Sequence, residues 1–238
     1  MRKKIANWIR NKVKEAKVEG IVMGLSGGID SCVVAALAKE AVGKEKLLAL
    51  ILPIHSLARD LKDAKLTAQQ LKITTKTVDL STAYDNLLKI LPRANNLVRM
   101  NLKPRLRMLT LYYFANKLNY LVCGTGNKAE ISVGYFTKHG DGGVDILPIG
   151  DLLKRDVRAL ARELKIPEHI ITKAPTAGLF PGQTDEGEMG ITYPELDDIL
   201  FRMEHKRPQR AGIKKVSKVK AMISRSEHKR QIPQTCYI

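Results

Sequence analysis

Cysteine is scarce in this sequence of 238 residues, and the three cysteines, Cys32, Cys123 and Cys236, are far apart. An odd count with no Cys-x-x-Cys pair argues against a disulfide framework and against a zinc or iron–sulfur site. Cys32 and Cys123 fall in apolar patterns, which is typical of core residues. A reducing compartment fits this cysteine usage best.

Long hydrophobic runs are missing as well, and no segment approaches the apolar length of a membrane span. The basic residues 1–4 precede apolar residues at helical spacing, with charges between them that interrupt any signal-peptide core. Internal repeats and low-complexity segments are also lacking. We therefore expect a soluble, cytoplasmic protein with no membrane partner.

The charge balance is strongly basic, with 41 Lys and Arg against 24 Asp and Glu and a net charge of +17. Such a charge favours anionic partners, namely nucleotides, nucleic acid or an acidic surface, but does not choose among them. With 44% hydrophobic residues, the chain can bury one substantial core. We expect one domain, residues 1–238.

Short apolar runs alternate with longer helical patterns along the chain. The runs at residues 21–25, 47–52, 74–80 and 120–123 predict strands, and the spacing in residues 30–42, 57–71, 81–91 and 102–118 predicts helices. This alternation predicts an α/β fold with a doubly wound parallel sheet. Ligands of such sheets bind beyond the carboxyl ends of the strands, where residues 24–31 and 124–130 both fall.

The most informative stretch is Gly-Leu-Ser-Gly-Gly-Ile-Asp-Ser, which joins the first predicted strand to an Ala-rich helix. Backbone N–H groups at the start of a helix are available to an anion, so the stretch predicts a phosphate site. It is not a Walker A loop, because it carries an acid, Asp30, where Walker A has its lysine. An acid beside bound phosphate needs a cation between them. The structural alternative is an ordinary glycine turn with Ser26 as helix N-cap.

A second glycine-rich stretch, Gly-Thr-Gly-Asn-Lys-Ala-Glu at residues 124–130, follows the last predicted strand. Glu130 supplies a hard oxygen that could share a magnesium ion with Asp30 and with phosphate oxygens. Taken alone, Glu130 is an ordinary acid at a helix start. The pairing of the two loops at one sheet edge is what favours a metal site.

Residues 134–145 form a third cluster, with two aromatic residues, Lys138 and a glycine-rich turn that leads to Asp145. The aromatic rings can stack on a planar group, and Lys138 can meet a phosphate or a carboxylate. Residues 174–190 combine six Gly and Pro residues with polar ones. We expect a long mobile loop there, either a passive connection or a lid that closes over substrate.

The motifs together resemble a known family. Ser-Gly-Gly-Ile-Asp-Ser is similar to the loop of the N-type ATP pyrophosphatases, which split ATP to AMP and pyrophosphate. The stretches at residues 124–130, 134–145, 175–179, 182–190 and 227–233 resemble those of the ammonia-dependent NAD synthetases, nearly over the full length. The resemblance implies a Rossmann-like adenine nucleotide alpha hydrolase fold and a homodimer, with residues 84–118 apolar enough to bury a partner surface.

The resemblance also implies roles for individual residues. The ATP site would contain Gly24, Leu25, Ser26, Gly27, Gly28, Ile29, Asp30, Ser31, Thr125, Lys154 and Thr176. Magnesium would be held by Asp30 and Glu130. The deamido-NAD site would contain Arg105, Lys138, Asp145, His228 and Lys229, with Arg107 competing for the assignment of Arg105. Residues 214–230 otherwise predict a solvated helix with a charged tail.

The implied reaction has two steps. The nicotinate carboxylate of deamido-NAD would first take AMP from ATP and release pyrophosphate, and ammonia would then displace AMP to give NAD. Asp145 is the candidate for orienting ammonium or accepting its proton; as an alternative it contacts a hydroxyl or amide of the substrate. No residue before the first strand supplies an amidase nucleophile, so we expect no glutaminase domain and no use of glutamine.

Two other classes remain as alternatives. A tRNA-modifying ATP pyrophosphatase would explain the net charge of +17, but it would need a sulfur-carrying cysteine or an RNA-binding extension. A nucleotide-binding regulator without chemistry would be expected to lack a metal-binding acid. Both Asp30 and Glu130 are present, so the sequence favours an enzyme, with no nucleic acid partner.

Overall fold

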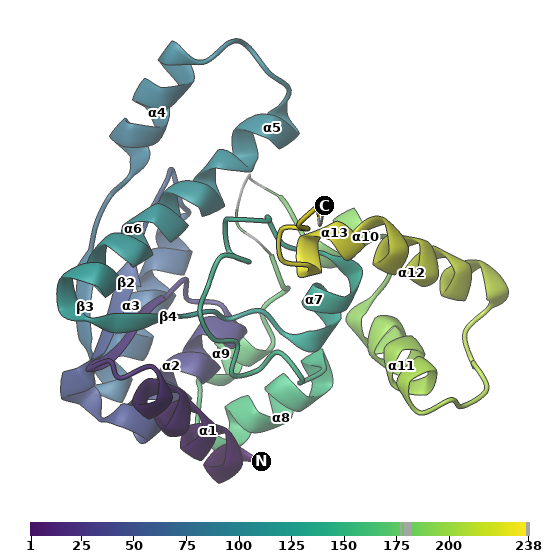
Figure 1. Ribbon diagram of the computed structural model, residues 1–238. Helices are drawn as coiled ribbons and strands as arrows, with labels where there is room; N and C mark the ends of the chain where they lie inside the picture. Colours follow the sequence, from purple (N-terminus) through teal and green to yellow (C-terminus); the bar gives the residue numbers. More distant parts are fainter. Residues whose placement is uncertain (177, 179–181, 237–238) are drawn as a thin grey trace.

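A parallel sheet lies at the centre of the molecule (Figure 1). The computed structural model describes residues 1–176, 178 and 182–236. Its strands are β1 (Gly20–Gly24), β2 (Leu47–Ile51), β3 (Thr74–Thr77) and β4 (Tyr120–Cys123), in the order β3-β2-β1-β4. The order changes direction between β1 and β4, so a crevice for ligands is expected at their carboxyl ends.

Helices cover both faces of this sheet, which confirms the predicted doubly wound α/β fold. Along the described residues they are α1 (Arg2–Glu15), α2 (Ile29–Val42), the 3-10 helix η1 (Lys44–Lys46), α3 (Ala58–Leu71), α4 (Ser81–Ile90), α5 (Asn96–Met100), α6 (Leu102–Leu118), α7 (Lys128–Val133), α8 (Lys154–Glu163), α9 (Glu168–Ile171), α10 (Asp185–Met189), α11 (Tyr193–Glu204), α12 (Ile213–Arg225) and α13 (Glu227–Arg230). Helices α1, α2, α3 and α8 pack on one face, and α6 packs on the other.

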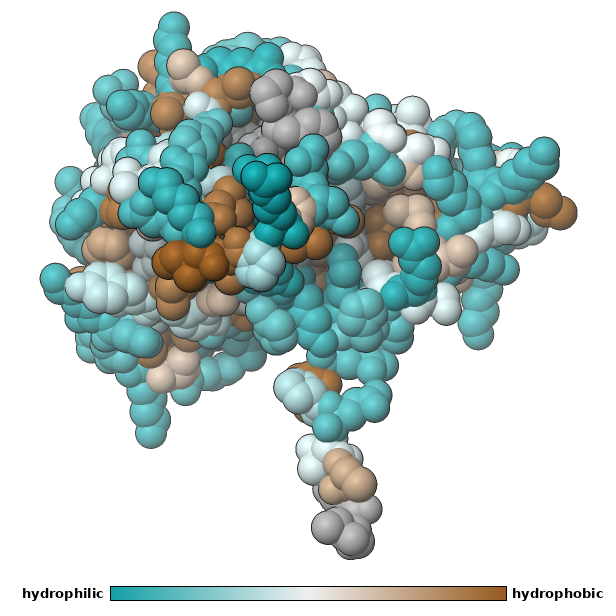
Figure 2. All heavy atoms as spheres, turned by 90° about the horizontal axis from the view of Figure 1, so that it is seen from above, coloured by the Kyte–Doolittle hydropathy of each residue, from teal (hydrophilic) through white to brown (hydrophobic). Residues whose placement is uncertain are grey.

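Helix α6 is apolar on two sides. Leu111 and Phe114 pack toward the sheet, whereas Leu109 and Tyr113 are more than half exposed. The neighbouring α4 and α5 also expose apolar side chains, among them Ile90 and Leu97. Figure 2, a view from above, shows apolar residues gathered on the side where Figure 1 places α4 and α5. Apolar side chains gathered on one exposed face are typical of an interaction surface.

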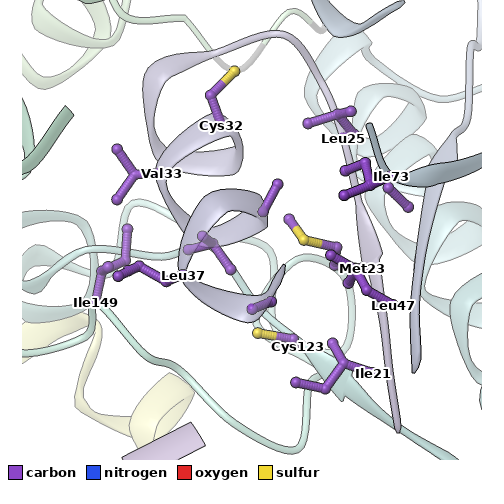
Figure 3. Packing of buried hydrophobic residues seen from close by; sticks show 14 of the residues in the cluster. Ile21, Met23, Leu25, Cys32, Val33, Leu37, Leu47, Ile73, Cys123 and Ile149 are labelled. Atoms are coloured by element: carbon purple, nitrogen blue, oxygen red, sulfur yellow. The ribbon is translucent and has the colours of Figure 1, made fainter. Parts of the chain in front are cut away.

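The core lies mainly between the sheet and α2 (Figure 3). Met23 of β1 and Leu37 of α2 are completely buried, and each such side chain stabilises the fold by about 1.5–3 kcal/mol. Cys32 and Cys123 are buried free thiols in this layer, as predicted, and burial raises the pKa of Cys32 to about 11. This packing holds the start of α2, and with it the glycine loop, in a fixed position.

Several predicted boundaries need correction. The strand predicted at residues 74–80 ends at Thr77, since its partner β2 ends two residues before Pro53, which has no N–H for the ladder. The segment 174–190 is not all loop, because its last part forms α10, capped by the Thr184 hydroxyl. The C-terminal segment is two helices rather than one, and it buries Val216 and Val219.

Candidate active site

The glycine loop after β1 is held by its own serines. The Ser31 hydroxyl donates to the Gly28 carbonyl at 2.9 Å, and the Ser26 hydroxyl accepts from the Gly28 N–H at 3.2 Å. Gly27 has φ +80, and a side chain there would collide with the Asp60 carbonyl of α3. Glycine is therefore required at this position, and the loop lies directly against α3.

Helix α2 begins at Ile29 with Gly28 as its N-cap and no side-chain cap. The alternative of an ordinary turn capped by Ser26 is therefore not what the structure shows. The first N–H groups of α2 have no partner within the helix, which is the arrangement that receives an anion. Leu25 and Ile29 are buried and anchor the two ends of the loop in the core.

The loop after β4 meets the glycine loop through Asn127. This side chain is completely buried and donates to Asp30 Oδ1 at 3.1 Å. It also forms a capping box with Glu130, whose Oε2 accepts from the Asn127 backbone N–H at 3.1 Å. The two acids predicted to share a metal ion therefore lie on adjacent strand ends, fixed by one asparagine.

Lys154, the first residue of α8, lies between these two acids. Its ammonium is 2.5 Å from Asp30 Oδ2 and 3.4 Å from Glu130 Oε1, and the side chain is only 1% exposed. The amino end of α8 is fixed by the buried Asp197, which accepts from the backbone N–H groups of Lys154 and Arg155. The Lys154 ammonium therefore pairs with both carboxylates that the sequence predicts as metal ligands.

The electrostatics of this cluster follow from its burial. Burial raises the pKa of Glu130 to about 7, against the opposing effect of Lys154. Burial disfavours the charged form of Lys154, but the carboxylates of Asp30 and Glu130 outweigh it and raise the pKa of the lysine. The cluster therefore keeps its ammonium charged and holds a carboxylate whose ionisation is costly.

This pKa predicts a pH dependence of stability. The pKa of Glu130 is about 7 in the fold against 4.5 as the ordinary value, so its contribution to stability is full below 4.5 and is lost as the pH rises through 7. Without metal, the wild-type free energy of unfolding should fall by about 1–3 kcal/mol relative to Glu130→Gln over this range. Urea unfolding with EDTA measures this difference. Two curves that stay parallel across this pH range would contradict the prediction.

Four of the five residues predicted for deamido-NAD form a second cluster. Arg105 of α6 donates to the Lys138 carbonyl at 3.3 Å, and Lys138 donates to the His228 carbonyl at 2.5 Å. Lys229 donates to the carbonyls of residues 134 and 136, both at 2.8 Å. Arg107 instead donates to the Leu52 carbonyl, away from these contacts. Three distant segments of the chain thus meet here.

Asp145 lies beside β4 and uses both of its oxygens there. It accepts from the Val122 backbone N–H at 2.7 Å and from the Tyr112 hydroxyl at 2.9 Å. Burial and then the hydrogen bond to Asp145 raise the pKa of Tyr112. The carboxylate remains exposed, as a residue that faces a ligand has to be.

The two predicted threonines lie on separate loops. Thr125 is partly buried between Gly124 and Gly126, directly after β4. Thr176 accepts from the Gly178 N–H at 3.1 Å. The expected lid is described only in part, because residues 177 and 179–181 lie outside the described residues. Its expected ordering on substrate binding therefore stays a prediction.

Three residues of the cluster, Asn127, Asp185 and Tyr193, are not predicted as site residues by the sequence. The Asn-x-x-Glu spacing at residues 127–130 is a capping-box signal that could have identified Asn127. The Tyr193 hydroxyl lies 3.2 Å from Glu130 Oε1 and 3.0 Å from Asp185 Oδ2, and the Lys154 ammonium lies 4.8 Å from the centre of its ring. No local pattern indicates these long-range contacts.

Comparisons with known proteins identify the family. The family described as NAD synthase matches residues 1–233. An NH(3)-dependent NAD(+) synthetase of Carboxydothermus hydrogenoformans is 49% identical over 236 residues, which cover 97% of this chain and 94% of the relative.

Solved structures similar to this chain agree with the family assignment. The NMN synthetase of Francisella tularensis has a TM-score of 0.92 and 38% identity, covering 100% of this chain and 97% of that one. The NH3-dependent NAD synthetase of Campylobacter jejuni has a TM-score of 0.86 and 30% identity, covering 99% and 97%. Within the described residues, no helix is long and apolar enough to cross a membrane. The chain belongs to the NAD synthase family, whose members are ATP-using ligases that form a carbon–nitrogen bond.

Proposed function

We propose that this protein is an ammonia-dependent NAD synthetase that catalyses the last step of NAD biosynthesis. It adenylates the nicotinate carboxylate of deamido-NAD with ATP and then amidates it with ammonia. The observation that carries the proposal is the meeting of Asp30, Glu130 and Lys154 beside an anion-binding loop, in a chain that matches the NAD synthase family over residues 1–233. We therefore favour this function over a tRNA-modifying ATP pyrophosphatase and over a nucleotide-binding regulator.

ATP is assigned to the edge of the sheet at β1 and β4. The loop 24–31 would hold its phosphates through the free N–H groups at the start of α2. Thr125, Lys154 and Thr176 would complete the site, the lysine as a point charge and the threonines as hydroxyl donors. The close contact of Gly27 with α3 supports this assignment, because it keeps the loop backbone in one conformation.

Magnesium is assigned to Asp30 and Glu130. Carboxylate oxygens are the ligands this ion prefers, together with phosphate oxygens and water. Among the described residues, no group of three or more His, Cys, Asp or Glu could hold a metal by itself, and water or phosphate oxygens would complete the coordination of an ion at these two acids. When bound, the ion would stabilise the charge that develops on the leaving pyrophosphate.

Deamido-NAD is assigned to the second cluster, with Arg105, Lys138, Asp145, His228 and Lys229. The contacts that join Arg105, Lys138 and the C-terminal residues support one continuous binding surface. They favour Arg105 over Arg107, whose guanidinium is used by the Leu52 carbonyl. Cations at this surface suit a dinucleotide with two phosphates.

The bonds made and broken follow from these assignments. A nicotinate carboxylate oxygen attacks the α-phosphorus, and the bond to pyrophosphate breaks. The nitrogen of ammonia then attacks the carboxyl carbon, and AMP leaves with the carboxylate oxygen. Asp145 would accept the proton that nitrogen loses, or orient ammonium before the attack. No side chain of the protein forms a covalent intermediate in this scheme.

The test is an assay of purified protein with ATP, magnesium, ammonium and deamido-NAD, following NAD and AMP together. Equal amounts of NAD and AMP are expected, and formation of ADP would contradict the proposal. The same assay is repeated with nicotinate mononucleotide in place of deamido-NAD, because one similar structure is named an NMN synthetase. Preferential turnover of the mononucleotide would favour that second function. Glutamine in place of ammonium is expected to give no product.

We also propose a homodimer, formed through α4, α5 and α6. These helices leave apolar side chains more than half exposed, namely Ile90, Leu97, Val98, Leu109 and Tyr113. The face lies on one side of the molecule, as an interface between two copies requires.

The three cysteines are free thiols, which fits the cytoplasmic location that we propose for the enzyme. We also propose that residues 1–238 form one domain.

The dimer predicts a large effect of one charge on α6. Leu109→Glu should convert the protein to a monomer, because the glutamate would have to be buried without a partner, at a cost of several kcal/mol. Light scattering after size-exclusion chromatography measures the mass. Ile213→Glu, on the exposed start of α12, is the matched control and should stay dimeric. A monomeric wild type, or a dimeric Leu109→Glu, would refute the interface.

A further inference from the structure

Asp185 is a buried carboxylate to which the proposed mechanism gives no role. It is the first residue of α10 and is 5% exposed, and its Oδ1 has no hydrogen bond of ordinary geometry among the described residues. Burial raises the pKa of Asp185, and the Tyr135 hydroxyl, which donates to Glu188, also acts on this carboxylate and lowers its pKa against that rise. A buried carboxylate oxygen without a donor costs free energy, so such an atom needs an explanation. Its other oxygen, Oδ2, accepts from the Tyr193 hydroxyl at 3.0 Å.

Tyr193 connects this carboxylate to the predicted metal ligands. The same hydroxyl lies 3.2 Å from Glu130 Oε1, so one phenol bridges the two carboxylates. A phenol has a single proton and can donate to only one of them at a time. Glu130 Oε1 also has the Lys154 ammonium at 3.4 Å, so the phenol proton can go to Asp185 Oδ2, and Asp185 Oδ1 is the oxygen left without a donor beside the fully buried Tyr193.

The charges around Asp185 also favour a bound cation. Asp30, Glu130 and Asp185 are three carboxylates, and Lys154 is the ammonium that pairs with two of them. The charge of Asp185 also acts on Lys154 and helps Asp30 and Glu130 to raise the pKa of this lysine. When all three carboxylates are ionised, three negative charges stand against one positive charge; burial raises the pKa of both Glu130 and Asp185 and so opposes this state unless a divalent cation compensates it.

We propose that Asp185 is a positioning residue of the cation site, whose Oδ1 accepts a hydrogen bond from water bound to the cation between Asp30 and Glu130. This inference rests on the proposed function, which assigns a magnesium ion to these two acids. A magnesium ion usually keeps several of its waters, so it can use a carboxylate that is not a direct ligand. Partners of this kind orient the ligands and attract the ion.

The experiment measures Mn²⁺ binding by electron paramagnetic resonance, with no nucleotide present, so its readout is independent of activity. Asp185→Asn should raise the dissociation constant for Mn²⁺ by about tenfold or more. Asp185→Ser should do the same and serves as the second variant if the asparagine protein does not fold. Asp198→Asn, on α11 and paired with Arg202, is the matched control and should bind Mn²⁺ like the wild type.

Tyr193→Phe separates a cation role from a purely structural one. If Asp185 only holds the Tyr193 hydroxyl, adding Asp185→Asn to Tyr193→Phe would leave the Mn²⁺ affinity unchanged, and the inference would be wrong. The inference requires a further loss of about tenfold in the double variant. Asp30→Asn tests the cation site itself, separately from the role of Asp185. Unchanged Mn²⁺ binding by Asp30→Asn would overturn the cation site as a whole. Loss in Asp30→Asn without loss in Asp185→Asn would overturn only the role of Asp185.

Discussion

Asp30→Asn and Glu130→Gln should each slow pyrophosphate release by at least about a hundredfold. Each amide keeps one oxygen at the same place but loses the charge that holds a divalent cation. The loss should be partly reversed by high magnesium concentrations, because the ion still has the phosphate oxygens and the second carboxylate as ligands. The measurement is the initial rate of pyrophosphate formation over a range of magnesium concentrations.

The matched control for this pair is Glu204→Gln, which removes an exposed carboxylate that pairs with Lys128. Its rate should stay close to that of the wild type, because exposed ion pairs contribute little. Thermal unfolding of every variant checks that the fold is intact. Wild-type rates in either Asp30→Asn or Glu130→Gln would show that these acids do not hold the metal.

Lys154→Met should tighten the binding of Mn²⁺ in the absence of nucleotide by about tenfold or more, although it removes a residue of the proposed ATP site. In the wild type the ammonium lies between Asp30 and Glu130 and competes with any metal ion for them. Without metal, the variant leaves Asp30 and Glu130, each less than a fifth exposed, without their ion-pair partner and should lose about 1–3 kcal/mol of stability. Added Mn²⁺ should restore much of this loss, because it binds the folded state.

Lys128→Met is the control, because Lys128 pairs with Asp151 and Glu204 near the surface. It should change neither the Mn²⁺ affinity nor the stabilisation by Mn²⁺. Calorimetric unfolding with and without Mn²⁺ gives both quantities. Equal or weaker Mn²⁺ binding by Lys154→Met would mean that the lysine helps to bind the cation rather than competing with it.

Elements with strong local signals could be predicted from the sequence. The bounds of β4 and α6 agree with the predicted residues 120–123 and 102–118, because an apolar run and a long helical period specify them locally. Helix α5 was missed, although its N-cap Asn95 accepts from the Val98 N–H. Helix α10 was missed because its flanking glycines resemble a loop.

The cluster itself was predicted only in part. The two glycine loops could be assigned to one sheet edge, since parallel strands bring their carboxyl ends together. The pairing of Lys154 with Asp30 joins residues 124 positions apart and has no local pattern. The same holds for Tyr193 and Asp185, which reach the site from beyond α8. Such contacts depend on how α8 and α11 pack, which sequence periodicity does not specify.

The most direct test of the central claim, that this protein activates a carboxylate with ATP, follows an oxygen atom. Deamido-NAD labelled with ¹⁸O in both oxygens of its nicotinate carboxylate is turned over with ATP, magnesium and ammonium, and the AMP is analysed by mass spectrometry. One ¹⁸O per AMP is predicted, because AMP leaves with the carboxylate oxygen that attacked the α-phosphorus. AMP without ¹⁸O would contradict the account, since the carboxylate would then never have been adenylated.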